Sequence, residues 1–191
     1  DRIAEAENGG YIIEPIDISS LGFSDDKIEE ILGKGILNTG NSYRIQQFIK
    51  KAKNGEDITV AYIGGSITRG SNASPMETKC YAYLTTQWLK DTFPDADINY
   101  VNAGIGATDS WLGVHRLKDD VLSADPDLVV VEFSVNDSQN INKETYDSLL
   151  RTCLEYETEP AVISLLLTAE NGSFADNHAP VAFKYQVPII S

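Results

Sequence analysis

A serine that could act as a nucleophile follows a short apolar run in the first half of the chain. Residues 58–62 are apolar and mostly β-branched, and Gly64, Gly65 and Ser66 come directly after them. Such a run predicts a strand buried on both faces, and the glycines allow a sharp turn at its end. Ligands bind at the carboxyl ends of strands in open α/β sheets. Ser66 is therefore predicted to lie at the rim of a crevice, where a nucleophile would meet its substrate.

Gly-Gly-Ser has two other interpretations when it is taken alone. It could be an ordinary strand-to-helix loop in which Ser66 caps the helix. It could also be a phosphate-binding loop, but no Gly-Lys-Ser/Thr follows and there is no Gly-x-Gly-x-x-Gly. The motif alone favours a plain loop and a catalytic serine about equally, so the neighbouring segments must decide.

Two further apolar runs end in loops that could assist a serine. Residues 98–101 lead into a glycine-rich loop that contains Gly106 and Ala107, and residues 128–133 lead towards Asn136. Parallel strands end at the same edge of a sheet, so these loops should meet around the serine. They would supply backbone N–H groups and a side-chain amide as donors to an oxygen that becomes negative. Acyl transfer needs this combination of a nucleophile and fixed donors.

The elements that position these loops alternate along the sequence. Apolar runs predict strands, and apolar residues at helical spacing predict helices between them. The predicted strands are 58–62, 98–101, 128–133, 161–167 and 187–190, and the predicted helices are 41–53, 81–89, 111–122, 146–156 and 179–185. This alternation predicts a three-layer α/β/α sandwich with a mainly parallel, five-stranded sheet of the flavodoxin-like type.

The first part of the chain is set apart from this pattern. Residues 1–40 are predicted to be an N-terminal extension or the tail of a preceding module, and residues 41–191 the α/β domain. Residues 11–18 could form an edge strand, because Pro15 excludes them from the centre of a sheet. Residues 24–32 have the pattern of a short helix that ends at Gly33.

Composition excludes several classes of partner. With 15 Lys and Arg against 29 Asp and Glu, the formal charge is −14, which repels nucleic acid and anionic membranes and favours a neutral or cationic substrate. No apolar run is long enough to span a bilayer. Cys80 and Cys153 form no Cys-x-x-Cys, so we expect buried free thiols and neither metal nor organic cofactor. The first residues do not resemble a secretory leader, and both the compartment and the oligomeric state stay open.

Three motifs together resemble the first three blocks of the SGNH/GDSL hydrolases. They are Gly64-Gly65-Ser66, the loop of residues 102–107 and Val135-Asn136-Asp137, in this order and spacing. The resemblance covers roughly residues 41–191 and implies an esterase that forms an acyl-serine. The sequences Gly-Gly-Ser-Ile-Thr and Asn-Ala-Gly-Ile-Gly-Ala-Thr are similar to those of bacterial carbohydrate esterases that remove acetyl groups from plant polysaccharides.

The resemblance implies a role for each matching residue. Ser66 would be the nucleophile, and its own N–H one donor of the oxyanion hole. Ala107, with Gly106 beside it, matches the family's glycine donor, and Asn136 would give the third donor through its side chain. The aspartate of the family's Gly-Asp-Ser is replaced by Gly65 here.

The family's base and its orienting acid, Asp-x-x-His, have no match. In the family they lie beyond the fifth strand, and we expect them to follow Ser191 in a segment absent from this sequence. The histidines here are His115 and His178. The helical spacing around His115 favours a packed helix residue. His178 is kept as a weaker candidate base, although its place before the last predicted helix favours a cap.

Other residues near the motifs are candidate substrate contacts. Trp111 follows the second loop and could stack on a sugar, Gly65 adjoins the serine, and Asp137 could orient the loops. Two other functions stay open: a lipase or thioesterase of the same superfamily, and a non-catalytic carbohydrate-binding module with an incomplete triad.

Overall fold

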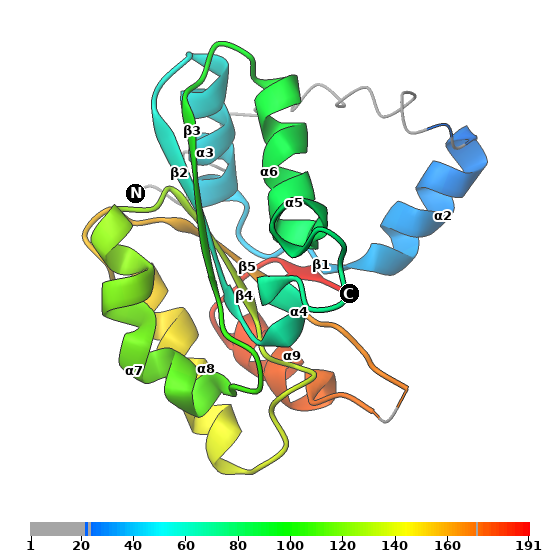
Figure 1. Ribbon diagram of the computed structural model, residues 1–191, viewed down its shortest axis with the longest axis vertical. Helices are drawn as coiled ribbons and strands as arrows, with labels where there is room; N and C mark the ends of the chain where they lie inside the picture. The colour runs from blue at the N-terminus through cyan, green and yellow to red at the C-terminus, as the bar shows by residue number, and fades with distance from the viewer. Residues whose placement is uncertain (1–21, 23, 171) are drawn as a thin grey trace.

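The computed structural model describes residues 22, 24–170 and 172–191, and its centre is a six-stranded sheet (Figure 1). The strand order is β1-β6-β5-β4-β2-β3. The strands are β1 (Ile36–Asn38), β2 (Ile58–Gly64), β3 (Ile98–Gly104), β4 (Leu128–Glu132), β5 (Ala161–Leu165) and β6 (Ile189–Ile190). Apart from β1, the order is that of a flavodoxin-like sheet, so the predicted fold class is confirmed.

Helices cover both faces of this sheet. They are α2 (Asp25–Gly35), α3 (Tyr43–Lys53), α4 (Ser66–Arg69), α5 (Met76–Lys79), α6 (Tyr81–Thr92), α7 (Ser110–Asp120), α8 (Ile141–Leu154) and α9 (Ala175–Lys184), with a short 3-10 turn η2 (Leu122–Ala124). In Figure 1, α7, α8 and α9 lie on one face, and α3 and α6 lie on the other.

The buried strand β2 separates two hydrophobic cores. Its side chains alternate between the faces, so Ala61 and Ile63 pack under α7 and α8, while Val60 and Tyr62 pack under α3 and α6. A strand that is apolar on both faces must lie inside the sheet, and β2 pairs in parallel with both β3 and β4. The C-terminal ends of these strands therefore open on the same rim.

The sheet differs from the prediction in its number of strands. The five predicted strands are present, and β1 is a sixth that pairs antiparallel with β6. Its three residues are too few to show an alternating pattern, and Ile36 and Leu37 are exposed. The strand proposed for residues 11–18 lies outside the described residues.

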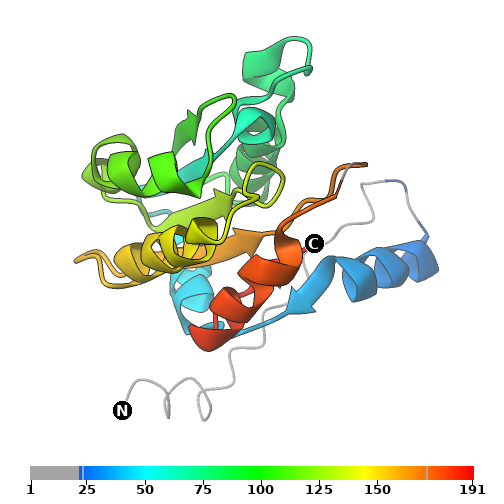
Figure 2. The same cartoon turned by 90° about the horizontal axis from the view of Figure 1, so that it is seen from below.

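Several element boundaries also moved. α2 continues two residues past the predicted stop at Gly33, and Figure 2 shows it extending to one side of the sheet beyond β1. α8 starts at Ile141, earlier than predicted. The prediction missed this start because the side chains buried near it, Asn142 and Thr145, are polar and give no apolar pattern. Cys80 and Cys153 are free and buried, as predicted. Among the described residues, no helix combines the length and apolar character needed to cross a bilayer.

Candidate active site

Ser66 is the first residue of the short helix α4, directly after β2. The residue at the N-cap position is Gly65, so the interpretation of Ser66 as a cap is wrong. The helix ends after one turn because Gly70 adopts φ +99, a left-handed conformation that glycine accepts easily. Ser66 is partly exposed, at the rim where β2 ends.

α4 lies directly on the backbone of the sheet because glycines leave room for it. A Cβ on Gly64 would lie 2.8 Å from Cβ of Thr68, and a Cβ on Gly104 would lie 2.7 Å from Cα of Arg69. Real Cβ atoms do not approach other atoms so closely, so a side chain at either position would push α4 away. The glycines at the ends of β2 and β3 therefore fix the depth at which the serine is held.

The amide of Asn136 lies against the residue that precedes the serine. A Cβ on Gly65 would overlap Oδ1 of Asn136 and lie 2.8 Å from its Cγ. The N–H of Asn136 donates to the carbonyl of Phe133 over 3.0 Å, so a tight turn after β4 delivers the amide to this place. Oδ1 is buried and has no hydrogen-bond partner among the described residues. β4 thus brings an amide beside the start of α4.

The loop after β3 reaches the serine from the other side. A Cβ on Gly106 would lie 4.0 Å from Cβ of Ser66 and 3.6 Å from Nη1 of Arg69. The N–H of Ile105 donates to the carbonyl of Gly64 over 3.1 Å, which ties this loop to the end of β2. Ala107 is exposed and has φ +59, a left-handed conformation in which glycine would be less strained.

His178 and Asp137 form a buried pair. Nε2 of His178 lies 2.8 Å from Oδ2 of Asp137, and the imidazole stacks on the ring of Tyr146 with centroids 3.7 Å apart. The other carboxylate oxygen of Asp137 accepts from the N–H of Ser110 over 2.8 Å. Asp137 is 4% exposed and His178 is 0% exposed. Asp137 is therefore closed to a substrate, and it connects α7 and α9 to the turn that carries Asn136.

The structure joins neither histidine to the serine. His178 lies inside α9 rather than capping it, and among the described residues no hydrogen bond links Ser66 to an imidazole. His115 is exposed on α7, where its ring meets that of Trp111 edge-on with centroids 4.8 Å apart. Trp111 itself is 51% exposed, so a large part of this residue is open to solvent.

Arg116 is a charged residue at this rim that the sequence patterns did not single out. Its guanidinium donates to the carbonyl of Ala103 over 2.6 Å and to the carbonyl of Gly64 over 3.2 Å. Its side chain is only 10% exposed and also pairs with Asp120 over 3.1 Å. One cation on α7 thus holds together the ends of β2 and β3, the two strands that position the serine and the second loop.

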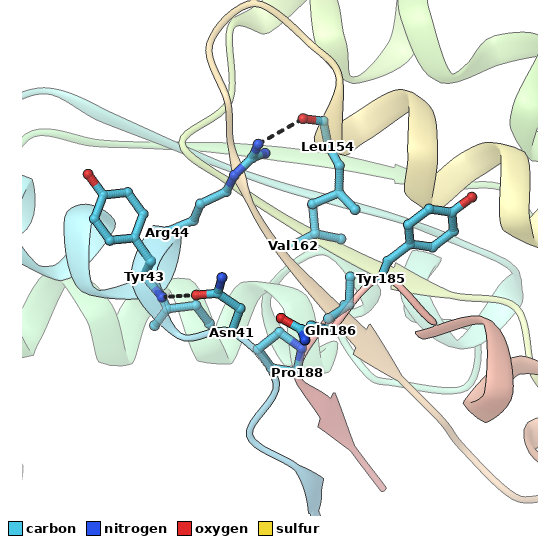
Figure 3. A pocket seen from close by; sticks show the side chains of 10 residues that line it. Asn41, Tyr43, Arg44, Leu154, Val162, Tyr185, Gln186 and Pro188 are labelled. Carbon is cyan, nitrogen blue, oxygen red and sulfur yellow. Dashed lines mark hydrogen bonds between the residues drawn. The ribbon is translucent and has the colours of Figure 1, made fainter. Parts of the chain in front are cut away.

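Two cavities differ in their relation to this rim. A cavity of about 370 Å³ adjoins α4 and the end of β3, and it is lined by Arg69, Met76, Glu77, Tyr100, Asn102 and Gly104. A second cavity of about 240 Å³ includes Val162, near the start of β5, so it belongs to the opposite rim (Figure 3). There Arg44 donates to the carbonyl of Leu154 over 2.9 Å, so its charge is already engaged. The first cavity lies next to α4, the helix that begins with the serine, although Ser66 itself does not line it.

The comparisons with known proteins agree with this geometry. The sequence profile of the GDSL-like Lipase/Acylhydrolase family matches residues 62–184, which contain all three loops. The chain belongs to this family. The predicted resemblance is thereby confirmed, and a search of curated protein sequences found no match. Among the described residues of this GDSL-like protein, no group of three or more His, Cys, Asp or Glu side chains could hold a metal ion.

Solved structures of esterases show the same fold. A two-domain esterase described as active on acetylated mannans, co-crystallized with mannopentaose, has a TM-score of 0.81 and 42% identity. The alignment covers 83% of this chain and 44% of that one, so the GDSL-like chain spans less than half of its relative. Axe2, an acetylxylan esterase from Geobacillus stearothermophilus, is 17% identical with a TM-score of 0.59, and the alignment covers 70% of this chain and 75% of that one. That second likeness concerns the fold alone.

Proposed function

We propose that this protein is a serine esterase that removes small acyl groups, acetyl foremost, from a carbohydrate through an acyl-serine intermediate. One observation carries the proposal: the ends of β2, β3 and β4 bring Ser66, Gly106 and Asn136 together on one rim. The likeness to an esterase active on acetylated mannans, at 42% identity, supports an acetylated polysaccharide as substrate.

In the proposed reaction, Oγ of Ser66 attacks the ester carbonyl carbon and its proton passes to a base. The carbonyl oxygen becomes negative and accepts hydrogen bonds from the N–H groups of Ser66 and Ala107 and from the Asn136 amide. The bond to the sugar oxygen then breaks, and the base returns its proton to that oxygen. Water attacks the acyl-serine in the same way, releasing the carboxylic acid and restoring the serine.

The base is the one part that the described residues do not supply. Nε2 of His178 is engaged with Asp137 and the side chain is fully buried, while His115 points to Trp111 on the surface. In the proposed mechanism the proton passes to an imidazole that neither His115 nor His178 provides. Assays of the chain therefore contain free imidazole in the buffer as the base.

The cavity next to α4 favours a sugar over a long acyl chain. Its lining combines a guanidinium, a carboxylate and an amide with the ring of Tyr100 and only one aliphatic side chain, Met76. Polar groups with one aromatic face suit a neutral, hydroxylated ring, whereas a fatty acyl chain needs apolar walls. The net charge of −14 also favours a neutral substrate over a polyanion. These features support the carbohydrate esterase over the lipase or thioesterase.

The test is the release of acid from a panel of esters, with imidazole present. The panel contains p-nitrophenyl acetate, butyrate and octanoate, together with acetylated manno-oligosaccharides. We expect the chain to release acid faster than its Ser66→Ala variant, whose rate measures the background hydrolysis by imidazole. We also expect it to hydrolyse the acetate ester faster than the octanoate ester. Equal rates for the chain and the variant on every ester would overturn the proposal. A preference for octanoate would support the lipase.

A non-catalytic carbohydrate-binding module is a second candidate, favoured by the absence of any bond between Ser66 and an imidazole in the described residues. Calorimetric titration with acetylated manno-oligosaccharides separates the candidates. Binding without any Ser66-dependent release of acetate supports the module. Release that depends on Ser66 supports the esterase.

A further inference from the structure

A carboxyl group is buried directly behind the proposed site. Glu132 is the last residue of β4, lies opposite Gly64 in the sheet and is 0% exposed. Acidic side chains are almost never fully buried unless they are paired or hydrogen-bonded, because an unpartnered charge is very unfavourable in the interior. No Lys or Arg of the described residues pairs with it. Its hydrogen bonds should therefore explain why it is there.

On one side the carboxyl faces the helix that begins with the serine. The hydroxyl of Thr68 donates to Oε2 of Glu132 over 3.5 Å, and it also lies 3.0 Å from the hydroxyl of Tyr81. Thr68 is fully buried, in the space that Gly64 leaves by lacking a side chain. The hydroxyl groups of Tyr81 on α6 and Thr68 on α4 thus lead to the carboxyl. Thr68 lies two residues after Ser66 in the sequence.

On the other side the carboxyl faces the turn that leads to the amide. The backbone N–H groups of Ser134 and Val135 lie close enough to the carboxyl to lower its pKa. The hydroxyl of Ser134 lies 3.5 Å from Oε1, although its bond to the carbonyl of Leu167 is shorter, 2.8 Å. Residues 134 and 135 come directly before Asn136. The carboxyl therefore also lies against the segment that carries the amide.

We propose that Glu132 is a positioning residue that fixes the distance between Ser66 and Asn136. It touches neither substrate nor reacting atoms, and it acts through its simultaneous contacts with the hydroxyl of Thr68 on α4 and the hydroxyl of Ser134 after β4. The proposal rests on the proposed function, in which the serine attacks and the amide stabilises the oxyanion. A displacement of about 1 Å between such groups can slow a reaction about 100-fold, so the linkage matters even though it is indirect.

The test compares variants that keep or remove the hydrogen bonds. Glu132→Gln keeps the shape and an acceptor oxygen, whereas Glu132→Leu keeps only the approximate size. The measured quantities are the maximal rate of covalent labelling of Ser66 by a fluorophosphonate ester, with imidazole present, and the probe concentration at half-maximal rate. We expect Glu132→Leu to lower the maximal rate about 10- to 100-fold with the half-saturating concentration unchanged, and Glu132→Gln to restore most of the rate.

Val162→Ala is the control for a general loss of stability. Val162 is buried in the core near the start of β5, away from the rim that carries Ser66. A Glu132→Leu protein that labels at the unchanged rate, or that slows no more than Val162→Ala at an equal loss of melting temperature, overturns the proposal. If Glu132→Leu does not fold, Thr68→Val removes the α4 side of the linkage alone and must slow labelling in the same way, or the proposal falls. Labelling that persists in Ser66→Ala instead defeats the proposed function, which keeps the two failures distinct.

Discussion

Asn136 occupies the space that a side chain on Gly65 would need, since a Cβ there would overlap the amide oxygen and lie 2.8 Å from Cγ. The glycine before the serine and the amide after β4 therefore form one packing unit. An aspartate at this position, as in the family's Gly-Asp-Ser, would require the amide to lie elsewhere.

Gly65→Ala is expected to displace the amide and slow the covalent labelling of Ser66 by a fluorophosphonate about 10- to 100-fold. The fold should persist, because the turn after β4 that carries Asn136 lies at the rim of the sheet and can shift. Gly33→Ala is the matched control, since a Cβ there meets nothing within 4 Å. Unchanged labelling of Gly65→Ala would show that the position of the amide does not matter.

Arg116→Met is expected to lower the free energy of unfolding by about 1–3 kcal/mol, because it removes donors from the buried carbonyls of Gly64 and Ala103. Denaturant titration measures this change. Lys118→Met on the exposed face of the same helix should have almost no effect. Equal stability of the two variants would contradict the role of Arg116 at the strand ends.

His178→Phe tests whether the buried histidine is a structural residue or the base. The phenyl ring can keep the stacking on Tyr146 but leaves Oδ2 of Asp137 without its partner, so stability should fall by about 1–3 kcal/mol or more. Labelling of Ser66 should keep the same dependence on pH. Labelling as low as in Ser66→Ala, with stability unchanged, would identify His178 as the base.

Burial raises the pKa of Glu132 above 4.5, and the nearby polar groups of Val135, Ser134 and Thr68 offset only part of this increase. The folded state therefore holds the proton more tightly than the unfolded state, so this residue's contribution to stability falls as pH rises from about 4.5 through the raised pKa. Glu132→Gln cannot ionise. The melting temperature of Glu132→Gln minus that of the unchanged chain should therefore increase as the pH rises through this range. Thermal scans from about pH 4 to pH 8 measure this difference. A constant difference would contradict the shift.

Much of the rim could be predicted because its signals are local. Apolar runs predicted β2, β3 and β4, and parallel strands must end on the same side, so Ser66, Gly106 and Asn136 were expected as neighbours before their distances were known. The sequence also contains the glycines at the strand ends, but it does not reveal what their missing side chains make possible. Gly64 and Gly104 make room for α4 rather than simply turning the chain.

The remainder depends on contacts between distant segments, which no local pattern reveals. Glu132 closes an otherwise apolar strand, and that anomaly was a signal of a buried, hydrogen-bonded carboxyl. Arg116 gave no comparable signal, since its partners are backbone carbonyls on two other strands. The burial of His178 depends equally on Tyr146 and Asp137, which lie 32 and 41 positions before it.

The central claim is that Ser66 is a nucleophile served by the Asn136 amide, and the most direct measurement is mass spectrometry of the chain after exposure to a fluorophosphonate ester with imidazole present. We predict an adduct on Ser66 that forms about 10²–10³ times more slowly in Asn136→Ala. An adduct on another residue, or an equal rate in Asn136→Ala, would contradict the claim.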